Sequence, residues 1–303
     1  MSEARSAAFT STVETLGAKL REREELLLCV DFDGTLSPVV DDPDAATILP
    51  ENRAALEALQ SHPNVTVAVV SGRELSDVRS RVDLTGITYA GNHGLELRTE
   101  GTTKVHPVAA EHKSDIERLS AELRETFETV RGVHVEDKGK TLTVHHRRAA
   151  DAHAERARRT VARLVGEFGG ETLTVGGDEE IVEVRPAIDW DKGSVVSSLL
   201  HDHASCLPVF VGDARTDEAG FRAVERDGVG VRVGDPDDRA TVATEFVSDP
   251  AETAALLEWF RRTGIDRLAA PLETTQARQA GQAGRTGTSP TSSSDDRPDA
   301  AGG

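Results

Sequence analysis

Short apolar runs alternate with helix-like segments over the first third of the chain. The runs 26–30 (LLLCV) and 65–70 (VTVAVV) are almost wholly apolar. Runs of this kind are typical of parallel strands, which are buried on both faces of a sheet. The segments around them predict further elements: helices at 1–24, at 50–60 and from Glu74, and strands at 87–90 and 95–97. Strands and helices that alternate at this spacing predict a doubly wound parallel sheet.

The pattern changes in the middle of the chain. Charged amphipathic helices are expected there, each followed by a pair of strands with turn residues between them: helices 112–130 and 150–168, and strands 133–137, 141–147, 171–175 and 181–185. This order predicts a compact antiparallel α+β unit. Apolar runs of the parallel type return at 208–213 and 228–233, so the unit is inserted into the first domain.

The expected fold is therefore a Rossmann-like α/β core with an inserted α+β domain. The core comprises residues 1–109 and 187–270, and the inserted domain comprises residues 110–186. From about Gln276 the sequence consists mostly of Gly, Ser, Thr, Pro and Ala without apolar periodicity. Such a segment cannot bury enough surface to fold, so residues 271–303 are expected to be a disordered tail without an assigned function.

The charge balance and the apolar runs exclude some classes of function. The formal net charge is −18, with 53 acidic and 35 basic residues. A nucleic-acid partner is not expected, because there is no basic excess to neutralise phosphates. No apolar run approaches the roughly 20 residues of a membrane helix, and the N-terminus lacks a secretory signal. Cys29 and Cys206 lie in or beside apolar runs, which indicates buried free thiols and a cytoplasmic protein.

Two carboxylates follow the first apolar run, in the segment DFDGT. Open α/β sheets bind their ligands where strands end, which is the position of Asp31 and Asp33. The two side chains could hold a hard cation, form an acyl-phosphate, or exchange a proton with a leaving group. An ordinary acidic loop remains the alternative at this point.

Three further segments carry polar residues at the ends of core strands or the start of a helix. Ser71 and Gly72 follow the second strand and could hold phosphate oxygens, although Ser71 alone also suits a helix cap. Lys192 opens a helix, where it could neutralise a phosphate or be a solvated surface lysine. Asp213 ends a third strand and could complete a cation site. Asp217 is then either a ligand through water or a helix N-terminal acid.

The order of these motifs resembles the haloacid dehalogenase-like superfamily. Over about residues 25–262 the sequence is also similar to the trehalose-6-phosphate phosphatase family. The resemblance rests on the segments DFDGTLSP, SGR, GNHG, VEDKGKTLTVHHR, EVRPAIDWDKG and GDARTDEAGF. The four core motifs indicate a type of reaction. Three other features are more particular to this family: the GNHG segment, the pair of EDK and HHR, and the EVRPAIDWDKG segment.

The resemblance implies a role for each candidate residue. Asp31 would be the nucleophile and Asp33 the acid/base. Asp31, the backbone carbonyl of Asp33 and Asp213 would hold Mg²⁺, while Ser71, Gly72 and Lys192 would contact the phosphate. The inserted domain would be a cap that closes over the sugar. The expected substrate-binding positions are Glu136, Lys138 and Glu183 in the cap, and His93 in the glycine-flanked GNHG loop.

The implied activity is hydrolysis of trehalose 6-phosphate in trehalose biosynthesis, downstream of a synthase that makes the phosphorylated disaccharide. A phosphatase for a sucrose, glucosylglycerol or mannosylglycerate precursor remains an alternative. A non-catalytic phospho-receiver domain is a second alternative. The large insertion and Asp33 argue against it, because an acid/base next to a phospho-aspartate would destabilise it.

Two positions depart from the family's usual pattern. Ala214 replaces the second acid of a GDD motif, which puts the affinity for magnesium in question. His146 stands where a tyrosine is common, and we expect it to be a structural residue on an exposed strand of the cap.

Overall fold

The computed structural model describes residues 3–168, 170–177, 179–203 and 205–270. The expected disordered tail, residues 271–303, lies outside the described residues. Residues up to Ala269 form one compact unit, and the domain boundaries given above stay a prediction. Within the described part of the chain, no helix is long and apolar enough to cross a membrane.

The central sheet has eight strands in the order β12-β11-β10-β1-β2-β3-β4-β5. Its first six strands in this order are parallel. Their bounds are Glu245–Val247 (β12), Val229–Val233 (β11), Cys206–Gly212 (β10), Glu25–Val30 (β1), Val65–Val70 (β2) and Thr88–Gly91 (β3). At the end of β1, Val30 pairs with Val211 of β10 and Val69 of β2. The loop that follows β1 therefore leaves the sheet at its centre.

The expected parallel sheet is confirmed in its main part but ends in an antiparallel hairpin. Strands β4 (Glu96–Thr99) and β5 (Thr102–Val105) continue the sheet beyond β3 in antiparallel register. Glu100 and Gly101 turn the chain between them with φ values of 50° and 81°, as two-residue hairpins require. Every residue of β5 is exposed, so this edge strand has no apolar pattern by which the sequence could predict it.

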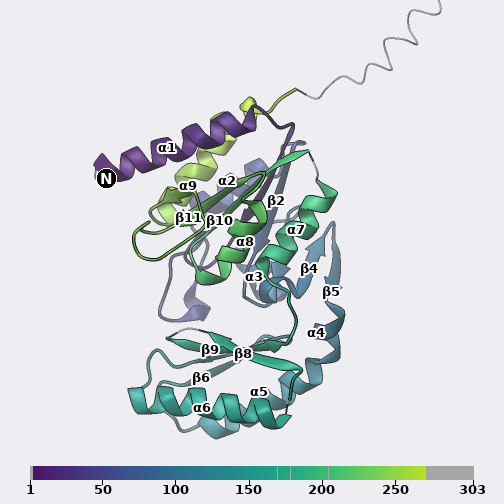
Figure 1. Cartoon of the computed structure of the whole chain (residues 1–303), viewed down its shortest axis with the longest axis vertical. Helices are drawn as coiled ribbons and strands as arrows, with labels where there is room; N and C mark the ends of the chain where they lie inside the picture. Colours follow the sequence, from purple (N-terminus) through teal and green to yellow (C-terminus); the bar gives the residue numbers. More distant parts are fainter. Residues whose placement is uncertain (1–2, 169, 178, 204, 271–303) are drawn as a thin grey trace, which may run out of the picture. The chain divides into compact units, whose positions relative to one another are not determined.

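Helices cover both faces of the central sheet, and the alternation of side chains along each strand decides which face they join. Leu26, Leu28 and Val30 of β1 pack with one group of helices, whereas Leu27 and Cys29 pack with the other. The first group comprises α1 (Glu3–Leu20), α2 (Pro50–Leu59), α3 (Leu75–Val82) and α9 (Pro250–Trp259). The second comprises α7 (Lys192–Asp202) and α8 (Glu218–Val224), which lie side by side in Figure 1.

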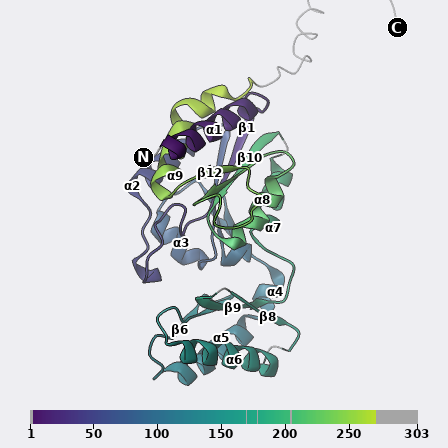
Figure 2. The ribbon, with the colours of Figure 1, turned by 60° about the vertical axis from the view of Figure 1, so that its left-hand side comes forward.

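The inserted segment forms a separate four-stranded antiparallel sheet in the order β6-β7-β9-β8. Its strands are His134–Asp137 (β6), Leu142–His145 (β7), Ile181–Pro186 (β9) and Leu173–Gly177 (β8). Helices α5 (Lys113–Phe127) and α6 (Asp151–Phe168) pack against one face of this sheet and form a second apolar core with it. Figures 1 and 2 show both helices on the side away from the central sheet, so the other face is turned towards the core. The expected order of helices and strands is confirmed.

Several short helical segments join these elements. They are α4 (Pro107–Glu111), η1 (Pro43–Ala45), η2 (Asn92–Gly94), η3 (Arg215–Asp217), η4 (Phe260–Gly264) and η5 (Ile265–Arg267). Two of them, η2 and η3, contain residues of the candidate site.

Candidate functional site

Asp31 lies directly after β1 at the carboxyl edge of the central sheet. Its backbone N–H donates to the carbonyl of Val211 at 2.9 Å, which continues the pairing with β10. The residue is 4% exposed, and its carboxylate is 2.8 Å from Nζ of Lys192. The ammonium group of Lys192 therefore favours the ionised form of this carboxylate, against the effect of its burial.

Lys192 is held in place by the start of α7. Asp191 caps this helix: its carboxylate accepts from the N–H of Ser194, whose hydroxyl accepts from the N–H of Asp191. Lys192 is 2% exposed, so the alternative of a solvated surface lysine is wrong. Burial alone would lower the pKa of Lys192, but the carboxylates of Asp217 and Asp31 raise it above its ordinary value.

Three carboxylates converge beside Lys192. Asp31, Asp213 and Asp217 each have an oxygen within 4.8 Å of the others. Burial, followed by the charge of Asp217, raises the pKa of Asp31 well above its ordinary value. The same two causes raise the pKa of Asp213 to about 7. Crowded, buried carboxylate oxygens match the ligand preference of a hard divalent cation, which would relieve their repulsion.

Asp217 has a more definite place than the sequence indicated. It is fully buried, and its two oxygens accept from Nζ of Lys192 at 2.6 Å and from the N–H of Ala214 at 2.8 Å. Asp217 therefore fixes the turn after β10 and shares the positive charge of Lys192 with Asp31.

Asp33 lies in the loop after Asp31 and points to a different partner. Arg73 Nε and Nη2 each lie 2.7 Å from one of its carboxylate oxygens. The side chain of Asp33 is 45% exposed, whereas that of Arg73 is 8% exposed. Gly34 follows with a φ of 73°, and a Cβ there would meet the carboxylate of Asp213 at 2.0 Å. Glycine therefore allows the loop to pass close to the carboxylate cluster.

Ser71 and Gly72 form the loop that follows β2. The hydroxyl of Ser71 accepts from the N–H of Arg73 at 3.2 Å. Since α3 begins only at Leu75, the alternative of Ser71 as a helix cap is wrong. A Cβ on Gly72 would come within 2.6 Å of the imidazole of His93, so this glycine lets the GNHG loop approach the phosphate-binding candidates.

The expected sugar-binding residues come together with this loop. His93 Nε2 is 2.8 Å from Glu183 of β9, and Lys138 Nζ donates to the carbonyl of Gly72 at 3.3 Å. Glu136 lies beside Lys138, with a 3.9 Å separation, and contacts His145. Burial would raise the pKa of Glu183, but His93 and then Lys138 lower it to about 2. The cap sheet thus presents charged groups to the core.

Asn92 and Arg73 are site residues to which the sequence analysis gave no role. The buried Asn92 amide donates to Glu96 at 2.8 Å and to the carbonyl of Lys138 at 3.0 Å, and it accepts from Thr141 at 2.7 Å. It therefore joins the core to the cap. Asn92 lies in the GNHG segment and Arg73 in the SGR segment, so these two motifs were the sequence features that could have indicated a role for them.

His146 differs from its expected exposure. It is 2% exposed, and its backbone N–H donates to the carbonyl of Glu180 at 2.9 Å. The expectation of an exposed position is wrong: backbone pairing with the segment before β9 continues through His146, and the residue is buried there.

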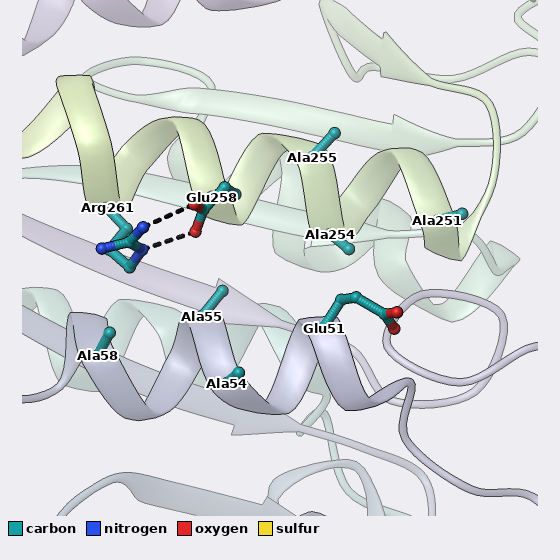
Figure 3. Close-up of a pocket in the computed structure, with 9 residues that line it drawn as sticks. All are labelled: Glu51, Ala54, Ala55, Ala58, Ala251, Ala254, Ala255, Glu258 and Arg261. Carbon is teal, nitrogen blue, oxygen red and sulfur yellow. Dashed lines mark hydrogen bonds and ion pairs between the residues drawn. The ribbon is translucent and has the colours of Figure 1, made fainter.

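A cavity of about 640 Å³ between α2 and α9 lies outside the candidate site. Figure 3 shows alanines of both helices facing it, with Glu51 at one end and the ion pair of Glu258 and Arg261 at the other. None of the candidate residues lines it.

Comparison with known proteins identifies the family to which this chain is similar. Residues 29–251 match the family model described as trehalose-phosphatase. The chain is 41% identical to the trehalose-phosphate phosphatase of Mycobacterium marinum, over 80% of this chain and 61% of that protein. It is 40% identical to that of Mycobacterium tuberculosis, over 81% of this chain and 63% of that protein. The chain thus spans less than two thirds of the length of these relatives.

Solved structures support the fold. The C-terminal domain of the Candida albicans trehalose-6-phosphate phosphatase superposes with a TM-score of 0.69 at 21% identity, covering 82% of this chain and 96% of that domain. A trehalose-6-phosphate phosphatase related protein superposes with a TM-score of 0.71 at 21% identity, covering 80% of this chain and 99% of that one. The sequence match and the identity to the mycobacterial relatives establish that this chain belongs to the trehalose-phosphatase family.

Proposed function

We propose that this chain is a phosphatase that hydrolyses trehalose 6-phosphate to trehalose and inorganic phosphate, with Mg²⁺ as its cofactor. The buried ion pair between Asp31 and Lys192 is the observation that carries the proposal. It supports a carboxylate nucleophile at the edge of the sheet whose ionised form is favoured by an adjacent ammonium group, with further carboxylates beside it to hold a cation. The names of the mycobacterial relatives support the choice of substrate.

In the first half of the proposed reaction, a carboxylate oxygen of Asp31 attacks the phosphorus, and the bond between phosphorus and the sugar oxygen breaks. Asp33 donates a proton to the departing oxygen. Lys192, the Ser71 hydroxyl and the backbone N–H of Gly72 stabilise the other phosphate oxygens. The products are trehalose and an acyl-phosphate on Asp31.

In the second half, Asp33 takes a proton from a water molecule whose oxygen attacks the same phosphorus. The bond to Asp31 breaks, inorganic phosphate leaves, and the carboxylate is restored. Asp31, the Asp33 backbone carbonyl and Asp213 would hold the Mg²⁺, which when bound supplies positive charge to the phosphate. Asp217 is assigned to hold Lys192 and the turn after β10, because its two oxygens accept from Lys192 Nζ and from the N–H of Ala214.

The proposal treats residues 110–186 as a cap domain between core segments 1–109 and 187–270. His93, Glu136, Lys138 and Glu183 are proposed to bind the sugar hydroxyls. His93 and Lys138 approach Gly72, and Glu183 and Glu136 lie beside them. This supports the assignment, because a sugar joined to the phosphate must lie beside that loop. A cap that completes the site only around the correct sugar excludes water and adds specificity.

The proposal also places the protein in the cytoplasm, with substrate supplied by a synthase that makes the phosphorylated disaccharide. The two buried free thiols, Cys29 and Cys206, support a reducing compartment. Burial raises the pKa of both thiols, that of Cys206 to about 11.

Phosphate release from a panel of sugar phosphates tests the function. We expect release from trehalose 6-phosphate with Mg²⁺, none with a chelator, and rates at least about tenfold lower for sucrose 6-phosphate and glucose 6-phosphate. Equal rates on all sugars would refute the substrate. A persistent phosphoprotein without release would refute the reaction. Asp31→Asn, checked for folding by circular dichroism, is the inactive control.

A further inference from the structure

A second cavity, of about 510 Å³, lies beyond the carboxyl ends of β10 and β11. It shares one wall with the candidate site, formed by Gly34 and Asp213. Asp31, Ser71 and Lys192 are not among the residues that line it, and neither is any residue of the cap. The cavity is therefore separate from the position proposed for the substrate's phosphate.

Three arginines line this cavity: Arg215, Arg232 and Arg239. Arg232 projects from β11 and is 3% exposed. Its Nη1 donates to the carbonyl of Arg239 at 3.1 Å, so the two residues are neighbours. The Nε atoms of Arg232 and Arg239 are buried, and neither has a hydrogen-bond partner in the described part of the chain. A buried N–H without a partner is costly, and each guanidinium carries one here.

The carboxylates around the cavity do not satisfy these donors. Asp249 caps α9, where one oxygen accepts from two backbone N–H groups and the other accepts from the Ser248 hydroxyl. Asp238 is 67% exposed and lies 3.8 Å from Arg232, beyond hydrogen-bond distance. The carboxylate of Asp213 lies with those of Asp31 and Asp217. The two guanidiniums therefore remain short of an acceptor.

We propose that this cavity, which we call the arginine cavity, binds a small oxyanion of the phosphate class. A guanidinium presents planar, parallel N–H donors that match phosphate oxygens. One tetrahedral anion beside Arg232 and Arg239 would supply acceptors to two guanidinium groups that lack them and offset two like charges. The volume accommodates inorganic phosphate or a small phosphate ester.

The arginine cavity is connected to the metal site through one hydrogen bond. Arg239 Nη2 donates to the backbone carbonyl of Asp213. An anion that shifts the side chain of Arg239 therefore acts on the position of Asp213. Occupancy of the cavity should therefore change the concentration of Mg²⁺ needed for half-maximal activity. This consequence rests on the proposed function, whereas the binding of an anion does not.

Calorimetric titration with inorganic phosphate, at constant ionic strength and with Mg²⁺, tests the site. We compare the wild type with Arg232→Met, which keeps the length of the side chain and removes its donors. The matched control is Arg226→Gln, because the side chain of Arg226 is 94% exposed and lies outside the cavity. We expect Arg232→Met to lose one bound phosphate per chain and Arg226→Gln to lose none. An unchanged stoichiometry and affinity in Arg232→Met overturns the proposal.

The two proposals fail in different ways. The wild type could bind only one phosphate, and Arg232→Met none. The single phosphate then belongs to the arginine cavity, which supports that proposal, and phosphate binding at the catalytic position is not supported. If that single phosphate survives in Arg232→Met, the cavity is refuted. Should Arg232→Met not fold, crystals of the wild type soaked in sodium tungstate decide the matter. Anomalous density between Arg232 and Arg239 supports the site, and density confined to the surroundings of Lys192 overturns it.

Discussion

Arg73 holds both carboxylate oxygens of Asp33, with N–O distances of 2.7 Å for each. The same guanidinium donates to Asp77 at 2.9 Å and to the carbonyl of Pro43 at 2.9 Å. A guanidinium bound by three groups is rigid, and a bidentate pair fixes the plane of the carboxylate. Since Arg73 directly follows Ser71 and Gly72, one short segment reaches both the phosphate position and the proposed acid/base.

Replacing Arg73 tests whether it positions Asp33. We expect Arg73→Met to lower kcat about tenfold to a hundredfold with little change in KM, because the acid/base loses its orientation but substrate contacts remain. Arg73→Lys should recover only part of kcat, since lysine cannot form the bidentate pair. Steady-state kinetics measures both constants, and circular dichroism checks the fold. A rise in KM alone would instead make Arg73 a substrate contact.

Asp33→Asn tests the second half of the proposed reaction. The amide cannot take a proton from water, so hydrolysis of the acyl-phosphate on Asp31 should become slower than its formation. We expect turnover to fall by at least about a hundredfold and a mass increase of one phosphoryl group on the protein during turnover. Intact-protein mass spectrometry after acid quenching detects this species. The double variant with Asp31→Asn should show no mass increase, and failure to find it in the single variant contradicts the assignment.

The carboxylate cluster predicts a pH-dependent stability in the metal-free protein. Burial and then Asp217 raise the pKa of Asp213 to about 7, whereas an unfolded aspartate titrates near about 3.9. The folded state therefore binds more protons between these values, and stability falls as the pH rises from about 4 to 7. The Asp213→Asn variant has no carboxylate at this position, so it should not lose this stability as the pH rises. We expect its Tm at pH 8 in chelator to exceed that of the wild type by a few degrees, with no such gain at pH 4.

Addition of Mg²⁺ provides the control for this prediction. A cation bound by Asp213 stabilises the folded wild type by mass action, so its Tm at pH 8 should rise, while that of Asp213→Asn should rise less. Differential scanning calorimetry measures the Tm of both proteins at pH 8, with and without Mg²⁺. Equal stability of the two proteins at pH 8 without metal would show that the carboxylate cluster does not destabilise the fold.

Much of the core domain could be predicted from local patterns of apolar residues in the sequence. The runs 26–30 and 65–70 became β1 and β2 almost residue for residue, because strands buried on both faces must be apolar throughout. Asp31, Ser71 and Asp213 follow β1, β2 and β10 at the same edge of the sheet, because parallel strands place their carboxyl ends at one edge. Strand β5 was missed because it is an exposed edge strand, and β12 because Glu245–Val247 is only three residues long.

Partners far apart in the sequence could not be predicted in the same way. The pair of Arg73 and Asp33 spans 40 positions, and the contact of Asn92 with Thr141 spans 49. Both depend on how loops from different strands meet, which periodicity does not encode. The buried position of Lys192 was likewise open in the sequence, because a helix-opening lysine is exposed unless carboxylates surround it.

Ala214 offers the last test, since it stands where the family resemblance leads us to expect a second acid. The residue is partly buried, and its N–H holds Asp217, which in turn holds Lys192. An aspartate there adds negative charge beside the proposed ligands. We expect Ala214→Asp to lower the Mg²⁺ concentration for half-maximal activity by about tenfold, as outer-shell carboxylates do. Ala214→Asn, of nearly equal size but neutral, should show a smaller effect. If neither variant changes the Mg²⁺ requirement, the second acid is dispensable here, because the bond between Asp217 and Ala214 already fixes the loop.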